Sequence, residues 1–535
     1  MTAVARAADW RDVRAPRPSV LSGLLAAACV TAQVPGEVSP DALFAGALPR
    51  LDLRLEPAAL KALEKDPREW ADFVLVEAGG ATLKDCHIKL KGSAGSFRPI
   101  TDPRPGFSIR TDKTLKKQEF RGLGKFQLNN CAQDGTMLLE MLAGEMARKA
   151  GVPASRCTHA WVSLNGKPLG PYVLKEGFNS EFLSYFFKDT KGHLYDGGFV
   201  ADIRPDMEVD RGDPKDSRRL KELIGACQEP DPAKRAERLN AVLDVDAYLR
   251  HLAMEQVFSH WDGYSFNRNN YRLFENRADG RFHFILHGMD QVFGDDRWYV
   301  FRRPGGLVPD ALWSYPAIRA RYREQFIQVY ERALRPIDWP RRALVAAEAV
   351  QLRLRPVSAE ESKRFTDRGR EASERIARRL DYVRQQLEDA SRLRRAGGTA
   401  ALGSYHWNRS TDKDAKANEP DFDGRGCFRL GIDAEGGADW RLQLALPAGR
   451  YRISAFVRTK EVQADPAKGP GFRLRLSGQG EDPAVKALTG TQNWRSVTAD
   501  FAVAEDSEPT LVMELKAAGG EAWIDRSSVS LTRLP

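Results

Sequence analysis

The first third of the chain alternates apolar and polar residues over short runs, a period of two that is typical of half-buried β-strands. Runs of this kind predict strands at residues 51–55, 72–77, 86–90, 107–110 and 125–128. Apolar residues at helical spacing predict one helix from about Thr136 to Ala150, which Gly151-Val152-Pro153 ends. The segment Ala160–Leu174 is predicted to be a hairpin, because Asn165-Gly166 is a strong tight-turn signal. Residues up to about 176 are therefore expected to form a small, mostly β lobe.

Beyond residue 176 the pattern becomes helical. The segment Asp244–His260 is predicted to be an amphipathic helix that starts at an aspartate. Two short strands are expected at Tyr271–Phe274 and Phe282–Leu286, and helices from Trp313 to about Leu393. We expect these residues, 177–395, to form a second, helical lobe.

The pattern changes again after the break at Arg394–Thr399. Regularly spaced alternating runs separated by turn signals then predict strands at residues 440–446, 451–457, 472–476, 494–501, 510–515 and 522–531. This spacing favours an antiparallel β-sandwich over residues 401–535. The chain as a whole is thus predicted to be α+β. Its 535 residues exceed one hydrophobic core, so two or more domains are expected.

Charge excludes little by itself. The 82 Lys and Arg residues exceed the 73 Asp and Glu residues and give a net charge of +9, but the two signs are interleaved along the chain. No motif that reads nucleic acid is found, so no nucleic-acid partner is expected. No internal apolar run approaches the ~20 residues of a transmembrane helix.

The N-terminus resembles an export signal. Arginines between Arg6 and Arg17 precede an apolar stretch, Val20–Ala32, that ends in small residues. We therefore predict a signal peptide or a disordered leader at residues 1–34, a linker at 35–47, and a periplasmic, cell-surface or secreted protein. Cys29 follows three alanines, which leaves a lipid anchor open.

The other five cysteines are scattered and form no CxxC pair, so a zinc site is not expected. Two alternatives remain for them, namely a disulfide among Cys86, Cys131 and Cys157, or buried free thiols.

One stretch has the spacing of a phosphoryl-transfer site. Asp262 is followed five residues later by Asn267, and His260 stands two residues before it. Two predicted strands later comes Asp290. Protein kinases place a catalytic Asp, a metal-binding Asn and a second metal-binding Asp in this order. Alone, the spacing is more often an ordinary turn, since Asp and Asn both favour turns.

Several motifs around this stretch together resemble the CotH family, a group of atypical kinase-like proteins of spore coats and of secreted bacterial proteins. They keep their order along the chain: KLKGS at 89–93, FRGLGKFQLNN at 120–130, GVPA at 151–154, LNGKPLGPYVLKE at 164–176, HLY at 193–195 and HWDGYSFNRNNY at 260–271. The resemblance implies a two-lobed protein-kinase-like domain over residues 48–395, ATP with Mg²⁺ or Mn²⁺, and phosphorylation of Ser or Thr on a protein substrate. By resemblance Asp262 is the catalytic Asp, and Asn267 and Asp290 hold the metal.

Other roles follow less directly from the resemblance. Lys91 and Arg104 are candidates for the cation that meets the ATP phosphates, with Lys89 and Arg110 left open. Glu176 ends the predicted hairpin, where a hinge between lobes would contact adenine or ribose.

The helix of the first lobe carries Glu140 and Glu145, and a kinase would set one of them against a phosphate-binding cation. The sequence also departs from the family: where family members often have Trp-Asp-x-Asp, this chain has His287-Gly288-Met289-Asp290, so only the second Asp remains. A non-catalytic kinase-like structural protein of an envelope or coat is therefore an alternative, as is transfer of AMP or glutamate on the same fold.

The tail is similar to carbohydrate-binding jelly-roll modules, through PAGRYRISAFVR at 447–458 and AWID at 522–525. The similarity implies polysaccharide as a possible partner of this module. Trp407, Trp440 and Trp494 are candidates to stack on sugar rings, although alternating aromatics are more often core.

Overall fold

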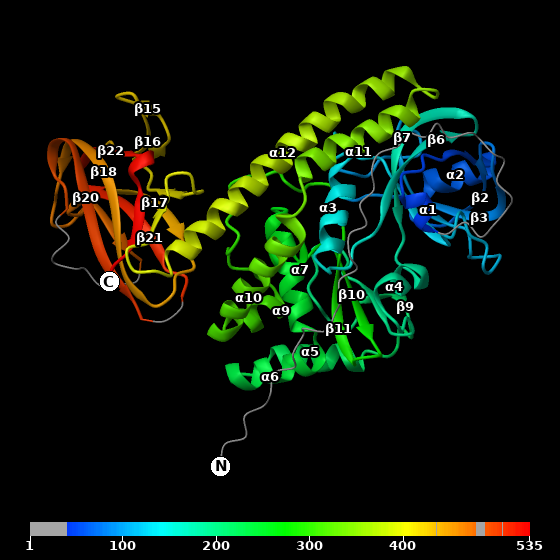
Figure 1. Ribbon diagram of the computed structural model, residues 1–535, viewed down its shortest axis with the longest axis horizontal. Coiled ribbons are helices and arrows are strands. Elements are labelled where there is room, and N and C mark those ends of the chain that lie inside the picture. The colour runs from blue at the N-terminus through cyan, green and yellow to red at the C-terminus, as the bar shows by residue number, and fades with distance from the viewer. Residues whose placement is uncertain (1–39, 435, 478–486, 505–506) are drawn as a thin grey trace, which may run out of the picture. The chain divides into compact units, whose positions relative to one another are not determined.

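The computed structural model describes residues 40–434, 436–477, 487–504 and 507–535. The predicted leader, 1–34, lies outside these ranges. The chain is α+β, as predicted, and its elements follow one another along the sequence in three groups (Figure 1). Within the predicted linker, Pro40–Phe44 forms a short helix, α1, whose Leu43 is buried.

The first group forms a closed β-barrel. Its strands hydrogen-bond in the order β1-β2-β3-β4-β5-β7-β6. Antiparallel neighbours make up most of it, and a parallel pairing of β1 with β6 closes it. The barrel core contains Phe107, Phe126 and Leu174, with relative exposures of 0%. The bounds are β1 (Arg50–Arg54), α2 (Pro57–Lys65), β2 (Ala71–Glu77), β3 (Thr82–Lys91), β4 (Gly106–Arg110), β5 (Lys125–Asn129), β6 (Cys157–Leu164) and β7 (Lys167–Glu176).

The helix predicted at 136–150 is α3 (Leu139–Lys149), and it begins later than expected. Asp134 accepts hydrogen bonds from the backbone N–H groups of Thr136 and Leu139, at 3.0 Å each, and Met137 has a φ of 60°. This turn keeps the preceding residues out of helical geometry. The buried residues of α3 pack into the core of the second group rather than into the barrel core, although α3 lies between two barrel strands in sequence.

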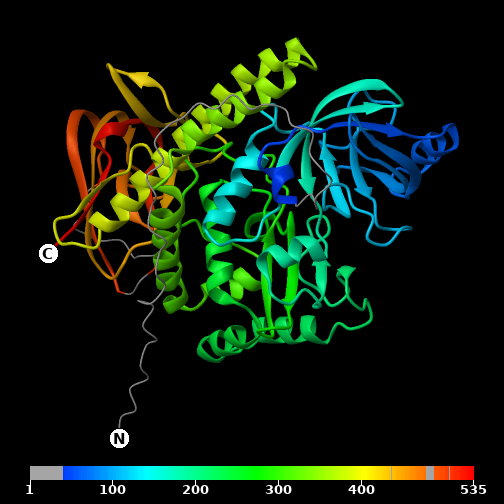
Figure 2. The same ribbon diagram turned by 45° about the vertical axis from the view of Figure 1, so that its right-hand side comes forward.

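The second group combines a four-stranded sheet, ordered β11-β10-β8-β9, with a set of helices. The bounds are α4 (Ser180–Phe186), β8 (Leu194–Asp196), β9 (Glu208–Arg211), α5 (Arg218–Cys227), α6 (Pro232–Val242), α7 (Val245–Val257), α8 (Tyr264–Asn267), β10 (Tyr271–Asn276), β11 (Arg281–Leu286), α9 (Leu307–Trp313), α10 (Pro316–Val329), the π-helix η1 (Tyr330–Leu334), α11 (Trp339–Leu354) and α12 (Ala359–Arg392). The long α12 packs along α11, as both views show (Figures 1 and 2). Among the described residues, none of the helices is both long and apolar enough to cross a membrane.

The third group consists of two antiparallel sheets that share one hydrophobic core. One is ordered β12-β23-β18-β22-β16-β14, with β15 on β16 and β20 on β18, and the other is β13-β17-β21-β19. The bounds are β12 (Thr399–Ala401), β13 (Asn408–Thr411), β14 (Ala415–Asn418), β15 (Asp421–Phe422), β16 (Arg425–Ile432), β17 (Gly436–Gln443), β18 (Gly449–Gln463), β19 (Gly471–Leu476), β20 (Gly490–Val503), β21 (Thr510–Ala517), β22 (Gly519–Asp525), the 3-10 helix η2 (Arg526–Ser528) and β23 (Ser530–Arg533). The cysteines at 86, 131, 157, 227 and 427 are all free thiols.

Candidate functional site

A cleft of about 510 Å³ brings together residues from the barrel and from the second group. That volume lies within the range of small-molecule sites. Lys91 of β3, Lys175 of β7 and Glu140 of α3 line it on one side. Asp262, Asn267 and Asp290, which the sequence predicts to act together, line it as well.

The cleft contains a buried ion pair between Lys175 and Glu140. The Lys175 ammonium donates to Glu140 Oε1, and both side chains are less than 5% exposed. Asn129 donates to the other carboxylate oxygen at 3.0 Å. Although burial alone favours the neutral acid, the Lys175 and Lys91 ammonium groups hold the pKa of Glu140 below its ordinary 4.5. Glu140 is thus ionised and fixes the position of Lys175. Kinases use a Lys–Glu pair of this kind to hold a phosphate-binding lysine.

Lys175 is the residue that sequence reasoning missed. The alternation of β7 could have identified it, because Tyr172 and Leu174 point into the barrel core while Val173 packs in the other core. Lys175 shares the face of Val173, on the side of α3.

Three asparagine amides converge on the carboxylate of Asp262. Asn267 donates to Oδ1 at 2.6 Å, Asn270 donates to Oδ2 at 2.8 Å, and Asn269 lies 3.1 Å from both oxygens. The tight turn that gathers them requires left-handed backbone at Arg268 and Asn270, with φ of 52° and 50°. The carboxylate is thereby held in one orientation toward the cleft.

His260 ties this loop to the segment that carries Asp290. Its ring nitrogen Nε2 lies 3.2 Å from the carbonyl oxygen of His287, and the His260 side chain is buried. Two glycines permit the close approach. A Cβ at Gly263 would lie 2.3 Å from Glu255 Oε1, and one at Gly288 would lie 2.2 Å from Asn270 Oδ1. Both glycines are therefore needed for the loop to sit where it does.

The C-terminal end of α7, which leads into the Asp262 loop, is supported by the buried guanidinium of Arg379. It donates to the carbonyl oxygens of Gln256 at 2.7 Å and Val257 at 2.9 Å, and also to those of Asp296 and Trp298. A helix end leaves carbonyls without helical partners, and Arg379 satisfies two of them. No sequence pattern indicates this role, because Arg379 is one of many arginines in α12.

Asp290 has an unusual acid–base character. Burial and the nearby Glu140 carboxylate raise the pKa of Asp290 from 3.8 to about 6. Burial and the Lys175 charge lower the pKa of His287 well below 6.5, so this residue is neutral at physiological pH. The site also has one carboxylate fewer than the family resemblance expects, because Gly288 stands at that position.

The residues present suit a cation such as Mg²⁺. Asp290 supplies a carboxylate, and Asn267 has its amide oxygen available because its nitrogen donates to Asp262. Mg²⁺ commonly takes one or two protein carboxylates together with substrate phosphates. In the described ranges, His, Cys, Asp and Glu form no group of three or more that would hold a metal alone.

Two predicted site residues lie away from the lining of the cleft. The Arg104 guanidinium lies over the Tyr172 ring, 6.0 Å from its centroid. Glu176 is 1% exposed and accepts from Arg156 Nε at 2.9 Å and Nη2 at 2.6 Å. Their roles at a nucleotide stay predictions, and neither side chain belongs to the lining described above.

The tail tryptophans differ in exposure. Trp407 and Trp440 are 3% and 2% exposed and belong to the core between the two sheets, so they are wrong as sugar-stacking candidates. Trp494 is partly exposed and stacks on Phe456, with ring centroids 5.8 Å apart.

Comparison with known proteins places these features in context. Residues 88–385, more than half of the chain, match the family described as "CotH kinase protein". A 263-residue segment is 24% identical to the inner spore coat protein H of Bacillus subtilis (strain 168), covering 46% of this chain and 70% of that protein. A 223-residue segment is 22% identical to the invasin CotH7 of Rhizopus delemar, covering 37% of each chain.

Among solved structures, the chain is similar to a family 35 carbohydrate-binding module from Clostridium thermocellum, at 13% identity and a TM-score of 0.18. This match covers 23% of the chain and 90% of the module. A Cellvibrio mixtus lichenase 5A module in complex with cellotriose matches at 16% identity, over 26% of this chain and all of the module, with a TM-score of 0.18.

Proposed function

Since the chain belongs to the CotH kinase protein family, we propose that it transfers the γ-phosphoryl group of ATP to a Ser or Thr hydroxyl of a protein acceptor. One observation carries the proposal: Asp262, Asn267 and Asp290 line the same cleft as the Lys175–Glu140 pair. These residues come from distant parts of the sequence, and a phosphoryl-transfer site needs each of their chemical types. The two-lobed arrangement of a kinase, with the barrel as the small lobe, is part of the same proposal.

Asp262 accepts the proton of the acceptor hydroxyl. The hydroxyl oxygen forms a bond to the γ-phosphorus while the bond from that phosphorus to the β,γ-bridging oxygen breaks, so ADP leaves with the electron pair. The asparagine amides around Asp262 keep its carboxylate aimed at the hydroxyl. Orientation of this kind is the main contribution that proteins make to phosphoryl transfer.

The other cleft residues bind the nucleotide phosphates. Asp290 and the amide oxygen of Asn267 would hold Mg²⁺ or Mn²⁺, which supplies positive charge between the phosphates. Lys175, held by Glu140, donates to a phosphate oxygen, and Lys91 adds a second positive charge at the same side of the cleft. These charges offset the charge of the nucleotide in a partly desolvated site.

The test is transfer by the purified chain and by Asp262→Asn, with labelled ATP, Mg²⁺ or Mn²⁺, and a generic acceptor protein. Asp206→Asn is the matched control, because its side chain is 82% exposed and outside the cleft. Intact mass then identifies the product. A gain of one phosphate that Asp262→Asn loses supports a kinase. A gain of AMP, or of glutamate in a parallel reaction that supplies it, indicates a different transfer, and no gain of mass supports a structural protein.

We further propose that the protein is exported and acts at an envelope or coat, where residues 401–535 contact polysaccharide. The partly exposed Trp494 is the candidate contact, since its ring is outside the core. Co-sedimentation with insoluble polysaccharides tests this. Retention that Trp494→Ala abolishes supports the proposal, and equal retention of both proteins contradicts it.

A further inference from the structure

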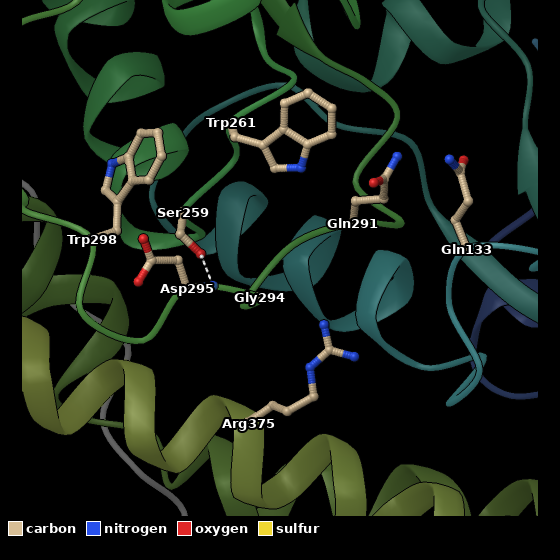
Figure 3. Close-up of a pocket in the computed structure, with 8 residues that line it drawn as sticks. All are labelled: Gln133, Ser259, Trp261, Gln291, Gly294, Asp295, Trp298 and Arg375. Carbon is tan, nitrogen blue, oxygen red and sulfur yellow. Dashed lines mark hydrogen bonds between the residues drawn. The ribbon is translucent and has the colours of Figure 1, made fainter. Parts of the chain in front are cut away.

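A second pocket, of about 440 Å³, adjoins the cleft (Figure 3). Gln133, Trp261 and Gln291 line both the pocket and the cleft, so the two spaces meet around Trp261. Arg375 of α12 and Trp298 form other parts of its wall. None of the roles assigned above uses this pocket.

The walls of the pocket are fixed by the same contacts that support the catalytic loop. Trp298 donates its indole N–H to Gln256 Oε1 at 2.5 Å, and its carbonyl oxygen accepts from Arg379 at 2.7 Å. Arg375 donates to the carbonyl oxygen of Val292 at 2.9 Å. Asp295 donates its backbone N–H to Ser259 Oγ at 3.4 Å, the contact dashed in Figure 3. A ligand would therefore meet a largely preformed surface, which reduces the entropy lost on binding.

The lining indicates what kind of group fits. Trp261 is 47% exposed, which leaves a large indole surface facing solvent beside the pocket. Arg375 and Asp295 contribute opposite charges, so the pocket has no formal net charge. The amides of Gln133 and Gln291 can both donate and accept, as recognition of a polypeptide backbone requires. These features together fit an extended peptide that carries an uncharged, apolar side chain.

The position of the pocket connects it to the acceptor. Trp261 immediately precedes Asp262, and an acceptor hydroxyl must come within about 2.6–3.2 Å of that carboxylate. An extended chain advances about 3.3 Å per residue, so residues next to the acceptor reach Trp261. We propose that this pocket binds the acceptor polypeptide and takes an apolar or aromatic side chain one to three residues from the phosphorylated Ser or Thr. The inference rests on the proposed kinase function.

Gly294 offers a way to block the pocket. It lines the pocket, and a Cβ added there would meet nothing nearer than 3.9 Å, the carbonyl oxygen of Gln291. Its φ does not lie in the left-handed region, so Gly294→Leu is compatible with the fold. Gly426→Leu is the matched control, because Gly426 is exposed in the third group and its added Cβ would lie 3.8 Å from Asp421 Oδ1.

The probe is a positional library of labelled Ser and Thr peptides, in which each flanking position is apolar, polar or charged. Binding is measured by fluorescence anisotropy with ADP and Mg²⁺, and transfer by kinetics with ATP. We expect the unmodified chain to prefer an apolar residue at one flanking position. Gly294→Leu should weaken peptide binding and raise the acceptor KM by about tenfold or more, with the ADP affinity changed less than about twofold.

The outcomes separate this inference from the proposed function. Peptide binding that Gly294→Leu abolishes, in a chain that transfers no phosphate, supports the pocket and contradicts the kinase. Transfer or binding that is equal in Gly294→Leu and Gly426→Leu overturns the pocket and leaves the kinase. An ADP affinity that falls with the peptide affinity unchanged assigns the pocket to the nucleotide, and failure of the unmodified chain to bind any peptide also overturns the inference.

Discussion

Replacing Asp290 by Asn should stabilise the protein in the absence of metal. Burial and Glu140 raise the pKa of Asp290 from 3.8 to about 6. Ionisation of Asp290 therefore costs more free energy in the folded protein than in the unfolded chain. The stabilising contribution of the protonated acid is present below pH 3.8 and is lost as the pH rises through about 6. If Asp290 were fully shielded from solvent, this pKa difference would correspond to about 3 kcal/mol of unfolding free energy. Because Asp290 is only partly buried, we expect about 1–3 kcal/mol at pH 8.

The assay is urea unfolding of the unmodified chain and of Asp290→Asn with a chelator present, at pH 8 and near pH 4. Asp290→Asn should be the more stable protein at pH 8, and the difference should approach zero near pH 4. Adding Mg²⁺ with ADP should stabilise the unmodified chain more, since a bound cation favours the carboxylate. The exposed Asp206→Asn is the control. A difference that does not change with pH, or a variant that is less stable at pH 8, would refute the reasoning.

Three further predictions concern buried charges. Lys175→Met should lower the free energy of unfolding by roughly 3 kcal/mol, because it leaves Glu140 buried without its partner. In a double-mutant cycle, adding Glu140→Gln to Lys175→Met should recover most of that loss, whereas additive effects of the two substitutions would exclude the coupling. Arg379→Met removes a buried donor from four carbonyls, of which those of Gln256 and Trp298 keep a second donor, Ser259 N–H and the Gln386 amide. It should cost about 2–3 kcal/mol in urea unfolding. The neighbouring Arg378→Met, 56% exposed, should cost little, and equal losses would contradict the role. Burial raises the pKa of Glu514, but the charges of Arg473, Arg475 and Lys516 outweigh burial and lower that pKa from 4.5 to about 2. Glu514→Gln should therefore lower the free energy of unfolding by about 2–3 kcal/mol at pH 7, and this loss should disappear as the pH falls from 4.5 toward 2. A loss that is unchanged between pH 7 and pH 3 would disprove the ionic origin.

Local patterns in the sequence predicted several elements well. The helix expected at 244–260 is α7, and Asp244 caps it by accepting from the backbone N–H of Ala247 at 2.9 Å. The hairpin predicted from Asn165-Gly166 is β6–β7, and both turn residues have positive φ, 49° and 79°. In each case the determining interactions lie within a few residues, where propensity and turn chemistry are readable.

Contacts between distant segments could not be predicted in this way. Closure of the barrel pairs Arg50–Leu53 with Trp161–Leu164, and nothing local in either segment specifies the other. The site has the same character. The spacing from Asp262 to Asp290 was readable because it repeats a known motif. Lys175 meets Glu140 only after the barrel and α3 have packed, and although it lies within the motif at 164–176, nothing in that motif distinguished its role from that of Lys167. The boundaries of the predicted domains stay predictions.

The position of Arg379 also matters during protein synthesis. This residue lies 117 positions after Asp262, so at about 5–20 residues per second the ribosome needs roughly 6–25 s to make it once the catalytic loop has been translated. A nascent chain in that interval already carries the predicted site residues, yet the end of α7 lacks its donor. A product truncated before α12 would therefore contain every predicted site residue up to Asp290, but the Asp262 loop would lack the support that Arg379 gives the end of α7. A unit in which the Asp262 loop keeps this support must extend at least to Arg379 in α12, well beyond Asp290.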